Sequence, residues 1–406
     1  SNLTYLFIIS LLLSCSSGQE KKLPQEPISC DILISNGTIY DGSGSKPYVG
    51  SLAIKDDKII YVGESTDFQA DTVIDATGLA VSPGFINMLS WGYNSLMDDG
   101  RALSDLKQGV TLEIFGEGTS PGPYWKDGKF TSFGEAMTML EEKGVSVNIG
   151  SFLGAATTRI LEVGYKNRQA TPSEMERMRG HVENSMKEGA MGIGSSLIYA
   201  PGDYASTEEL TELSKVASEY GGMYISHLRS EGTNLLEALE ELISISRNAS
   251  IPAEVYHLKA SREPNWSKLD DVIKRIEEVR KEGLKITADI YTYNASSTGL
   301  TGVIPTWVQE GGHRAWINRM KDPEVRPRLL ADIREQLDEQ PPEGILLVGF
   351  KTSKMSRKYL AKTVAEAAAM RGQTPEEAIV DMVIEDDHRI QCLSLIHISE
   401  PTRRPI

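Results

Sequence analysis

The sequence predicts an α/β fold, a (β/α)8 barrel that lacks its last strand and follows a small antiparallel β unit. Short apolar runs separated by turn residues fill positions 31–81. From Gly84 onward, strand-like runs alternate with helical patterns. The 406 residues are enough for one large barrel with an accessory unit.

The β unit is predicted to span residues 30–83. Its strand-like runs lie at 32–34, 38–40, 51–54 and 58–63, with turn signals at Asn36-Gly37, Asp41-Gly42 and Asp56-Asp57. Runs this short, joined by turns this tight, are typical of antiparallel hairpins.

The barrel is predicted over residues 84–390. Seven candidate strands lie at 85–89, 111–115, 145–149, 191–195, 223–227, 253–257 and 285–290. Helical patterns such as 207–220 and 235–248 separate them, which favours a parallel sheet. An eighth strand is expected beyond residue 390, and a mostly helical insertion at about 300–387 is expected to cap the barrel mouth.

Neither end of the chain follows the pattern of the predicted barrel. The apolar run 3–13 is too short to span a bilayer and ends just before Cys15. Residues 1–22 therefore resemble a bacterial lipoprotein signal and polar linker, with a generic secretory segment as the alternative. We expect a location in the bacterial cell envelope, periplasmic or on the surface, with a lipid anchor at Cys15. Residues 391–406 resemble translated adapter sequence and are expected to be a non-native tail.

Composition excludes some classes of partner. The net charge of −15 argues against nucleic acid, because a phosphate backbone requires a basic face. The cysteines Cys15, Cys30 and Cys392 make neither a disulfide framework nor a zinc motif. Contact with a membrane is expected only through the anchor, and the oligomeric state is not predicted.

Two histidines end strand-like runs in successive units. His227 closes one such run and His257 closes the next, and each is followed two positions later by a cation, Arg229 or Lys259. Side chains at the carboxyl ends of barrel strands converge on one mouth. Two imidazoles placed there are able to share a metal ion, most often zinc.

Several motifs in order resemble the N-acyl-D-amino-acid deacylase (D-aminoacylase) family of the amidohydrolase superfamily. They are Pro83-Gly84-Phe85-Ile86, Gly192-Ile193-Gly194-Ser195-Ser196-Leu197-Ile198-Tyr199, His227-Leu228-Arg229, His257-Leu258-Lys259 and Asp289-Ile290-Tyr291. The resemblance covers about residues 31–390. It implies a metal-dependent hydrolase that cleaves the linear amide of N-acyl-D-amino acids, small-molecule substrates, into a carboxylate and a D-amino acid.

Two departures from the family pattern alter the implied metal site. The superfamily's first-strand His-x-His is replaced by Leu89 and Trp91, which removes one of two usual metal positions. The family's second-strand cysteine is absent, and Glu117 lies one position before its place. The expected ligand set is therefore Glu117, His227 and His257 around one zinc ion per chain. The alternative for Glu117 is a buried carboxylate bonded to loop amides.

The resemblance also implies roles for other residues. Lys259 and Arg229 are candidates to bind the substrate carboxylate, and the alternative for each is an internal salt bridge. Tyr199 is expected to bind the polarised carbonyl oxygen, while Tyr291 is a second substrate tyrosine or a packed aromatic. No residue matches the family's general-base aspartate at the end of strand eight, so the catalytic acid–base residue is unknown and turnover by this chain is expected to be poor.

Two further functions remain open from the sequence. The reshaped first strand is compatible with hydrolysis of cyclic amides or of dipeptides that carry a D-residue. A barrel that has lost one metal position is also compatible with an anchored, non-catalytic binding protein.

Overall fold

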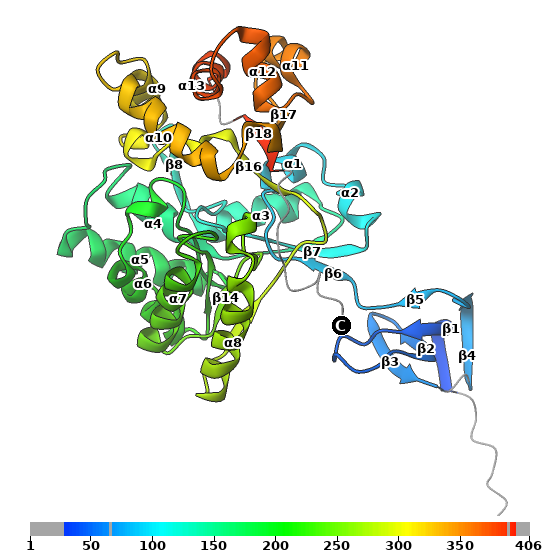
Figure 1. Ribbon diagram of the computed structural model, residues 1–406. Coiled ribbons are helices and arrows are strands. Elements are labelled where there is room, and N and C mark those ends of the chain that lie inside the picture. Colours follow the sequence, from blue (N-terminus) through cyan, green and yellow to red (C-terminus); the bar gives the residue numbers. More distant parts are fainter. Residues whose placement is uncertain (1–27, 65–66, 388–389, 395–406) are drawn as a thin grey trace, which may run out of the picture. The chain divides into compact units, whose positions relative to one another are not determined.

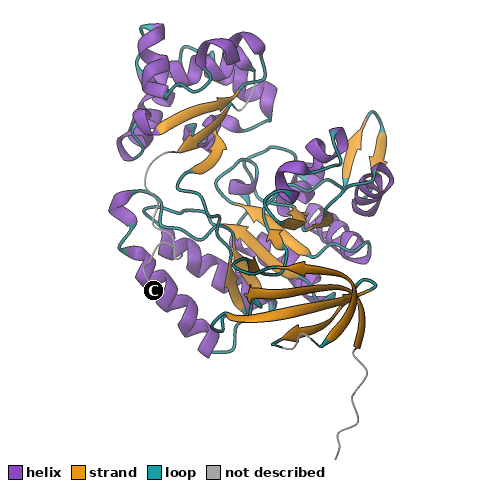
Figure 2. Cartoon of the chain, turned by 90° about the vertical axis from the view of Figure 1, so that its right-hand side faces the viewer, coloured by secondary structure: helices purple, strands orange, loops and turns teal. Residues whose placement is uncertain are grey.

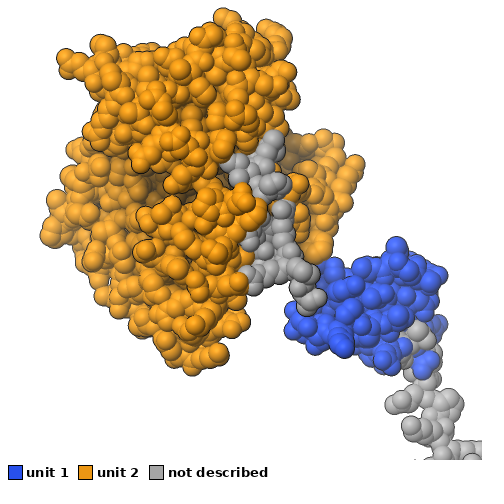
Figure 3. Space-filling model, viewed as in Figure 1, with its two compact units in different colours: residues 1–84 blue, residues 85–406 orange. Residues whose placement is uncertain are grey.

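The computed structural model describes residues 28–64, 67–387 and 390–394 (Figure 1). The chain divides into two compact units, residues 1–84 and 85–406, which are coloured separately in Figure 3. The anticipated signal segment and Cys15 lie outside the described residues, so the lipid anchor stays a prediction. Within the described ranges, no helix combines the length and apolarity needed to cross a bilayer.

The first unit is a mixed β-sheet. Its strands are β1 (Ile28–Ile39), β2 (Tyr48–Lys55), β3 (Lys58–Gly63), β4 (Phe68–Asp75) and β5 (Ala80–Val81). Strand β1 pairs antiparallel with β2 but parallel with β4 and β5, which corrects the expectation of purely antiparallel pairing. The turn at Asp56-Asp57 joins β2 to β3 as expected, whereas Asn36-Gly37 forms an irregularity inside the continuous strand β1. Turn residues indicate where the chain reverses locally, and they do not indicate which distant strand pairs with β1.

The second unit contains seven successive positions of parallel strand. The strands are β6 (Phe85–Asn87), β7 (Val110–Phe115), β10 (Asn148–Ser151) with β11 (Leu153–Gly154), β12 (Gly192–Ser196), β13 (Met223–His227), β14 (Ala253–Val255) and β15 (Ile286–Ala288). The order of pairing is β6-β7-β10 and β11-β12-β13-β14-β15, all parallel. Only Phe152 separates β10 from β11, so the two sheets follow one another along the chain. The predicted strands are all found, and closure into a barrel stays a prediction.

Helices separate these strands. They are α1 (Tyr93–Asp98), α2 (Leu103–Leu106), α3 (Phe133–Lys143), α4 (Ala155–Glu162), α5 (Pro172–Lys187), α6 (Thr207–Glu219), α7 (Leu235–Ala249) and α8 (Lys268–Lys281), together with the short hairpin β8 (Tyr124–Lys126) and β9 (Lys129–Thr131) and the 3-10 helices η1 (Gly202–Tyr204) and η2 (Glu263–Asn265). Helices α5 to α8 pack side by side in chain order (Figure 1). Ser132 and Thr171 begin α3 and α5 with capping boxes, which satisfy amide groups that a helix leaves unpaired at its start.

The insertion after β15 forms its own core. It contains β16 (Ser296–Gly299), η3 (Leu300–Val303), η4 (Thr306–Gln309), α9 (His313–Met320), α10 (Arg326–Glu339), η5 (Pro342–Gly344), β17 (Ile345–Gly349), α11 (Ser353–Tyr359), α12 (Val364–Arg371), α13 (Pro375–Asp386) and β18 (Gln391–Ser394). The strands pair antiparallel in the order β16-β18-β17, and helices dominate the rest (Figure 2). Strand β18 uses the first residues of the expected tail, with Cys392 buried. Residues 395–406 lie outside the described part of the chain.

Apolar burial holds the strand and helix layers of the second unit together. Ile114 of β7, Phe152 between β10 and β11, Ile225 of β13 and Tyr256 just after β14 form one cluster and are at most 1% exposed. A larger cluster joins the strands to α5, α6, α7 and α8. Because side chains alternate across a strand, one set packs on one face of the sheets and the other contacts the helices. This arrangement brings the carboxyl ends of the strands to one side.

One buried ion pair is an exception to this apolar packing. The Arg159 Nη1 and Glu209 Oε2 atoms lie 2.6 Å apart, with side chains 0% and 3% exposed. The Glu209→Gln substitution would leave the Arg159 charge buried without its partner, so we expect a loss of about 3–5 kcal/mol in the free energy of unfolding. Urea denaturation measures this loss.

Glu212→Gln is the matched control. Glu212 pairs with Arg179 at 3.1 Å but is 37% exposed, so its removal should cost less than about 1 kcal/mol. Equal losses in the two variants would contradict the importance of the buried pair.

Candidate metal centre

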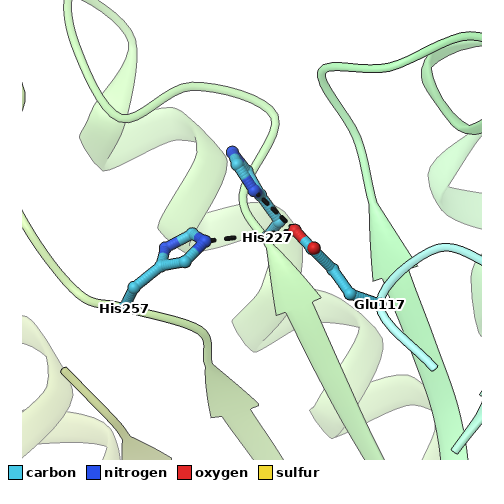
Figure 4. A group of neighbouring side chains, drawn as sticks. All are labelled: Glu117, His227 and His257. Atoms are coloured by element: carbon cyan, nitrogen blue, oxygen red, sulfur yellow. Dashed lines mark hydrogen bonds and ion pairs between the residues drawn. The ribbon is translucent and has the colours of Figure 1, made fainter. Parts of the chain in front are cut away.

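Three side chains from three separate strands meet at one point. Glu117 follows β7, His227 ends β13 and His257 lies just after β14. One ligand atom from each lies within 4.8 Å of the others, as Figure 4 shows. These are the three residues expected to hold the metal, and the structure brings them together.

The geometry of the three ligands fits a small divalent cation. Glu117 Oε1 lies 2.8 Å from His227 Nδ1 and 4.0 Å from His257 Nε2. Ligand atoms around a tetrahedral zinc ion are about 3.3 Å apart, given zinc–ligand bonds of about 2.0 Å. The two observed separations bracket that value. His227 Nε2, the ring nitrogen on the side away from Glu117, is buried without a hydrogen bond.

The backbone before Glu117 requires glycine. Gly116 has φ +108°, and a Cβ atom there would lie 2.3 Å from the Phe152 carbonyl oxygen. This close approach turns the chain at the end of β7 and directs Glu117 toward the histidines. His257 also adopts a positive φ of +39°, and its backbone N–H donates to Asp289 Oδ1 at 2.6 Å.

Trp91 occupies the place of the missing histidine and contacts the same carboxylate. Its indole Nε1 donates to Glu117 Oε2 at 2.7 Å. The two oxygens of Glu117 therefore have different partners, because Oε1 faces the histidines and Oε2 faces Trp91. The departure from the family pattern at Trp91 thus supplies a hydrogen-bond donor where the superfamily usually has a second metal ligand.

Burial and neighbouring charges shift the pKa values of His257 and Glu117. Burial, with the charge of Lys259, lowers the pKa of His257 to about 4, so the imidazole is neutral near pH 7. Burial opposes ionisation of Glu117, but the hydrogen bond from His227 and the nearby imidazoles lower the pKa of Glu117 overall. A neutral imidazole and an ionised carboxylate are the forms that ligate zinc.

The two cations predicted to bind the substrate carboxylate are paired with carboxylates of the protein itself. Lys259 is 3% exposed and its Nζ lies 2.5 Å from Glu231 Oε1. The Arg229 guanidinium donates to both oxygens of Glu241, at 2.9 and 2.8 Å, and to backbone carbonyls. Both cations thus form the internal ion pairs that the sequence left as their alternative.

The two predicted tyrosines flank the histidines. The Tyr199 ring centroid lies 5.7 Å from that of His227, and its hydroxyl bonds to Thr298 Oγ1 in the insertion. The Tyr291 ring centroid lies 6.4 Å from that of His257, with Lys259 Nζ 5.6 Å from the Tyr291 ring. Both tyrosines are therefore near the candidate metal centre.

Sequence reasoning missed two acidic residues at this site. Glu231 has no role in the sequence-based site, yet its carboxylate lies 2.9 Å from His257 Nδ1. Asp289 was noted only as part of a family motif, and its buried Oδ2 has no hydrogen-bond partner. Burial raises the pKa of Asp289 to about 7, and the neighbouring Glu254 carboxylate adds to this effect. For Glu231, its position four residues after His227 was the available signal.

A cavity of about 480 Å³ adjoins the metal centre. It is lined by the two histidines, by Arg229, Glu231 and Lys259, and by residues of the insertion that include Thr298, Glu339 and Ile345. This volume suits a small molecule. Fold and site together define an α/β protein in which three candidate metal ligands, Glu117, His227 and His257, lie beside a ligand-sized cavity.

Comparison with known proteins shows which proteins this chain resembles. No protein-family model matches the chain. The D-aminoacylase of Alcaligenes xylosoxydans xylosoxydans is 30% identical over 285 residues, which cover 66% of this chain and 59% of that protein. The N-acyl-D-glutamate deacylase of the same organism is 28% identical over 284 residues, covering 66% of this chain and 58% of its own. The chain thus spans less than two thirds of the length of these curated relatives.

Solved structures show the same fold. The N-acyl-D-glutamate deacylase of Bordetella bronchiseptica, complexed with zinc and a phosphonate inhibitor, has a TM-score of 0.72 at 22% identity, over 91% of this chain and 72% of its own. A D-aminoacylase structure has a TM-score of 0.71 at 24% identity, with the same coverage. The chain is a homologue of the D-aminoacylases, and the amidohydrolase fold and family resemblance predicted from the sequence are confirmed.

The Gly116→Ala substitution tests how the Glu117 loop is built. The added Cβ would overlap the Phe152 carbonyl oxygen, at a φ that alanine tolerates poorly, so a loss of about 1–3 kcal/mol is expected. Thermal melting checks the effect. Gly180→Ala is the control, because an alanine Cβ at that helical glycine would have nothing within 4 Å and the substitution should be neutral or stabilising. A Gly116→Ala variant as stable as Gly180→Ala would contradict this account of the loop.

Proposed function

We propose that this chain is a zinc-dependent hydrolase of the linear amide bond of N-acyl-D-amino acids, with one zinc ion per chain. The observation that carries the proposal is the meeting of Glu117, His227 and His257 within 4.8 Å at the strand ends. Two imidazoles and a carboxylate form a known catalytic zinc set. When bound, zinc lowers the pKa of a coordinated water and polarises an amide carbonyl.

The residues around the cavity have the chemistry to orient such a substrate. The Tyr199 ring lies near His227, and its hydroxyl is able to donate to a carbonyl oxygen. Lys259 and Tyr291 lie on the side of His257 and offer a cation and a phenol to the substrate carboxylate. Since Lys259 already contacts Glu231, a bound carboxylate would compete with that ion pair.

The relatives support the same reaction class. The curated proteins are named D-aminoacylase and N-acyl-D-glutamate deacylase, and a structural neighbour holds zinc with a mimic of the tetrahedral intermediate. The activity, the metal identity and the stoichiometry of this chain are proposals, because the chain spans only 59% of the D-aminoacylase.

Metal binding is tested with His257→Ala. We expect the unmodified chain to bind one zinc ion and the variant to lose most of its affinity, because one of three protein ligands is removed. Competition with a chromogenic chelator measures the affinity. His313→Ala is the control, since His313 is 47% exposed and pairs with Asp387 away from the site. Equal zinc affinity in both variants would remove the basis of the proposal.

Substrate class is tested with a panel of compounds. The zinc-loaded chain should release free amino acid from N-acetyl-D-amino acids faster than from the L-enantiomers, at a low rate because no general-base aspartate was matched. Amine release over long incubations measures the reaction. Release only from cyclic amides or D-residue dipeptides would redirect the proposal to those substrates. Substrate binding without any release would favour the anchored binding protein.

A further inference from the structure

Glu231 lies between the two histidines, on the side away from Glu117. It follows β13 in the loop before α7, and its side chain is 18% exposed. Its Oε1 is 2.9 Å from His257 Nδ1 and 3.8 Å from His227 Nε2. The opposite nitrogens, His257 Nε2 and His227 Nδ1, are the ones that face Glu117 (Figure 4). Each imidazole therefore has one nitrogen toward each carboxylate.

The loop around Glu231 is fixed by the segment after β14. The Ser261 N–H donates to the Glu231 backbone carbonyl at 2.8 Å, and Ser261 Oγ donates to Glu231 Oε2 at 3.3 Å. Because Oε2 is used in this way, Oε1 is the oxygen directed at the histidines. The placement of the carboxylate is therefore defined by contacts outside the metal ligands.

His257 Nδ1 has two competing partners. Glu231 Oε1 would accept its proton at 2.9 Å, while Lys259 Nζ would donate to it at 3.0 Å. If Nδ1 carries the proton and donates it to Glu231, the Nε2 lone pair is available at the metal site. If Nδ1 accepts from Lys259, the proton of a neutral ring resides on Nε2 and blocks ligation. The charge of Glu231 favours the first arrangement, and it also holds Lys259 at 2.5 Å.

We infer that Glu231 is a positioning residue of the proposed metal centre that holds His257 in the tautomer that ligates metal. This inference rests on the proposed function, because it requires a metal at Glu117, His227 and His257. Ligating histidines commonly donate their second N–H to a carboxylate, which fixes tautomer and ring orientation. Here one carboxylate lies beside the second nitrogen of both rings.

The test is the zinc affinity of Glu231→Gln. Glutamine keeps the size of the side chain but removes the charge, so Lys259 is free to donate to His257 Nδ1. We expect zinc to bind about 10-fold to 100-fold more weakly, with a changed visible spectrum when cobalt replaces zinc. Glu237→Gln is the matched control, because it makes the same charge change at an exposed position of α7. Melting of the metal-free proteins shows whether each variant is folded.

A second variant separates tautomer control from a general loss of packing. Adding Lys259→Met to Glu231→Gln removes the competing donor and should recover part of the zinc affinity. Zinc affinity of Glu231→Gln equal to that of the unmodified chain would overturn the inference and leave the metal centre intact. An equal loss in the single and double variants would overturn the tautomer mechanism. Failure of the unmodified chain to bind zinc would overturn the metal centre itself.

Discussion

The hydrogen bond between Glu117 Oε1 and His227 Nδ1, 2.8 Å long, is the contact on which the site depends. It joins the ends of two strands that are 110 positions apart in the sequence. A buried carboxylate is costly unless it is paired, so these strand ends must approach closely for the fold to be stable. The same requirement creates the metal-binding geometry, because it brings an oxygen and a ring nitrogen to one point beside His257.

Trp91 and Glu117, two positions that depart from the resemblance noted in the sequence, are in direct contact. Trp91 donates to Oε2 of Glu117 at 2.7 Å, which leaves Oε1 directed at the histidines. A carboxylate has room for several donors, so one oxygen is available to the indole and the other to a metal. The Trp91 indole therefore contacts one oxygen of Glu117, and the other oxygen remains directed at the candidate histidine ligands.

Charge pairing extends from the metal centre around the cavity. Among the described residues, each lysine or arginine that lines the cavity contacts a carboxylate, as Arg229 does with Glu241, Lys259 with Glu231 and Arg262 with Glu339. A negatively charged substrate would enter a region whose cations are already neutralised. Its binding therefore requires exchange of partners, and the pair of Lys259 with Glu231 is the one beside the candidate metal ligands.

The sequence by itself determined the parallel strands and the residues at their ends. Apolar runs followed by helical patterns located β13 and β14, and so placed His227 and His257 at one side of the sheet. Glu117, one position before the place of the family's absent cysteine, completed the expected ligand set. These features are local, because strand periodicity and strand ends are written in neighbouring residues.

Only the tertiary structure decided which side chains contact one another and which strands pair. It placed Glu231 beside His257 and His227, paired Arg229 with Glu241, and ran β4 parallel to β1. Each of these depends on which distant segments pack together, and several carboxylates near each cation satisfy the sequence pattern equally well. Burial then selects one partner, since an unpaired charge inside the protein is too costly to retain.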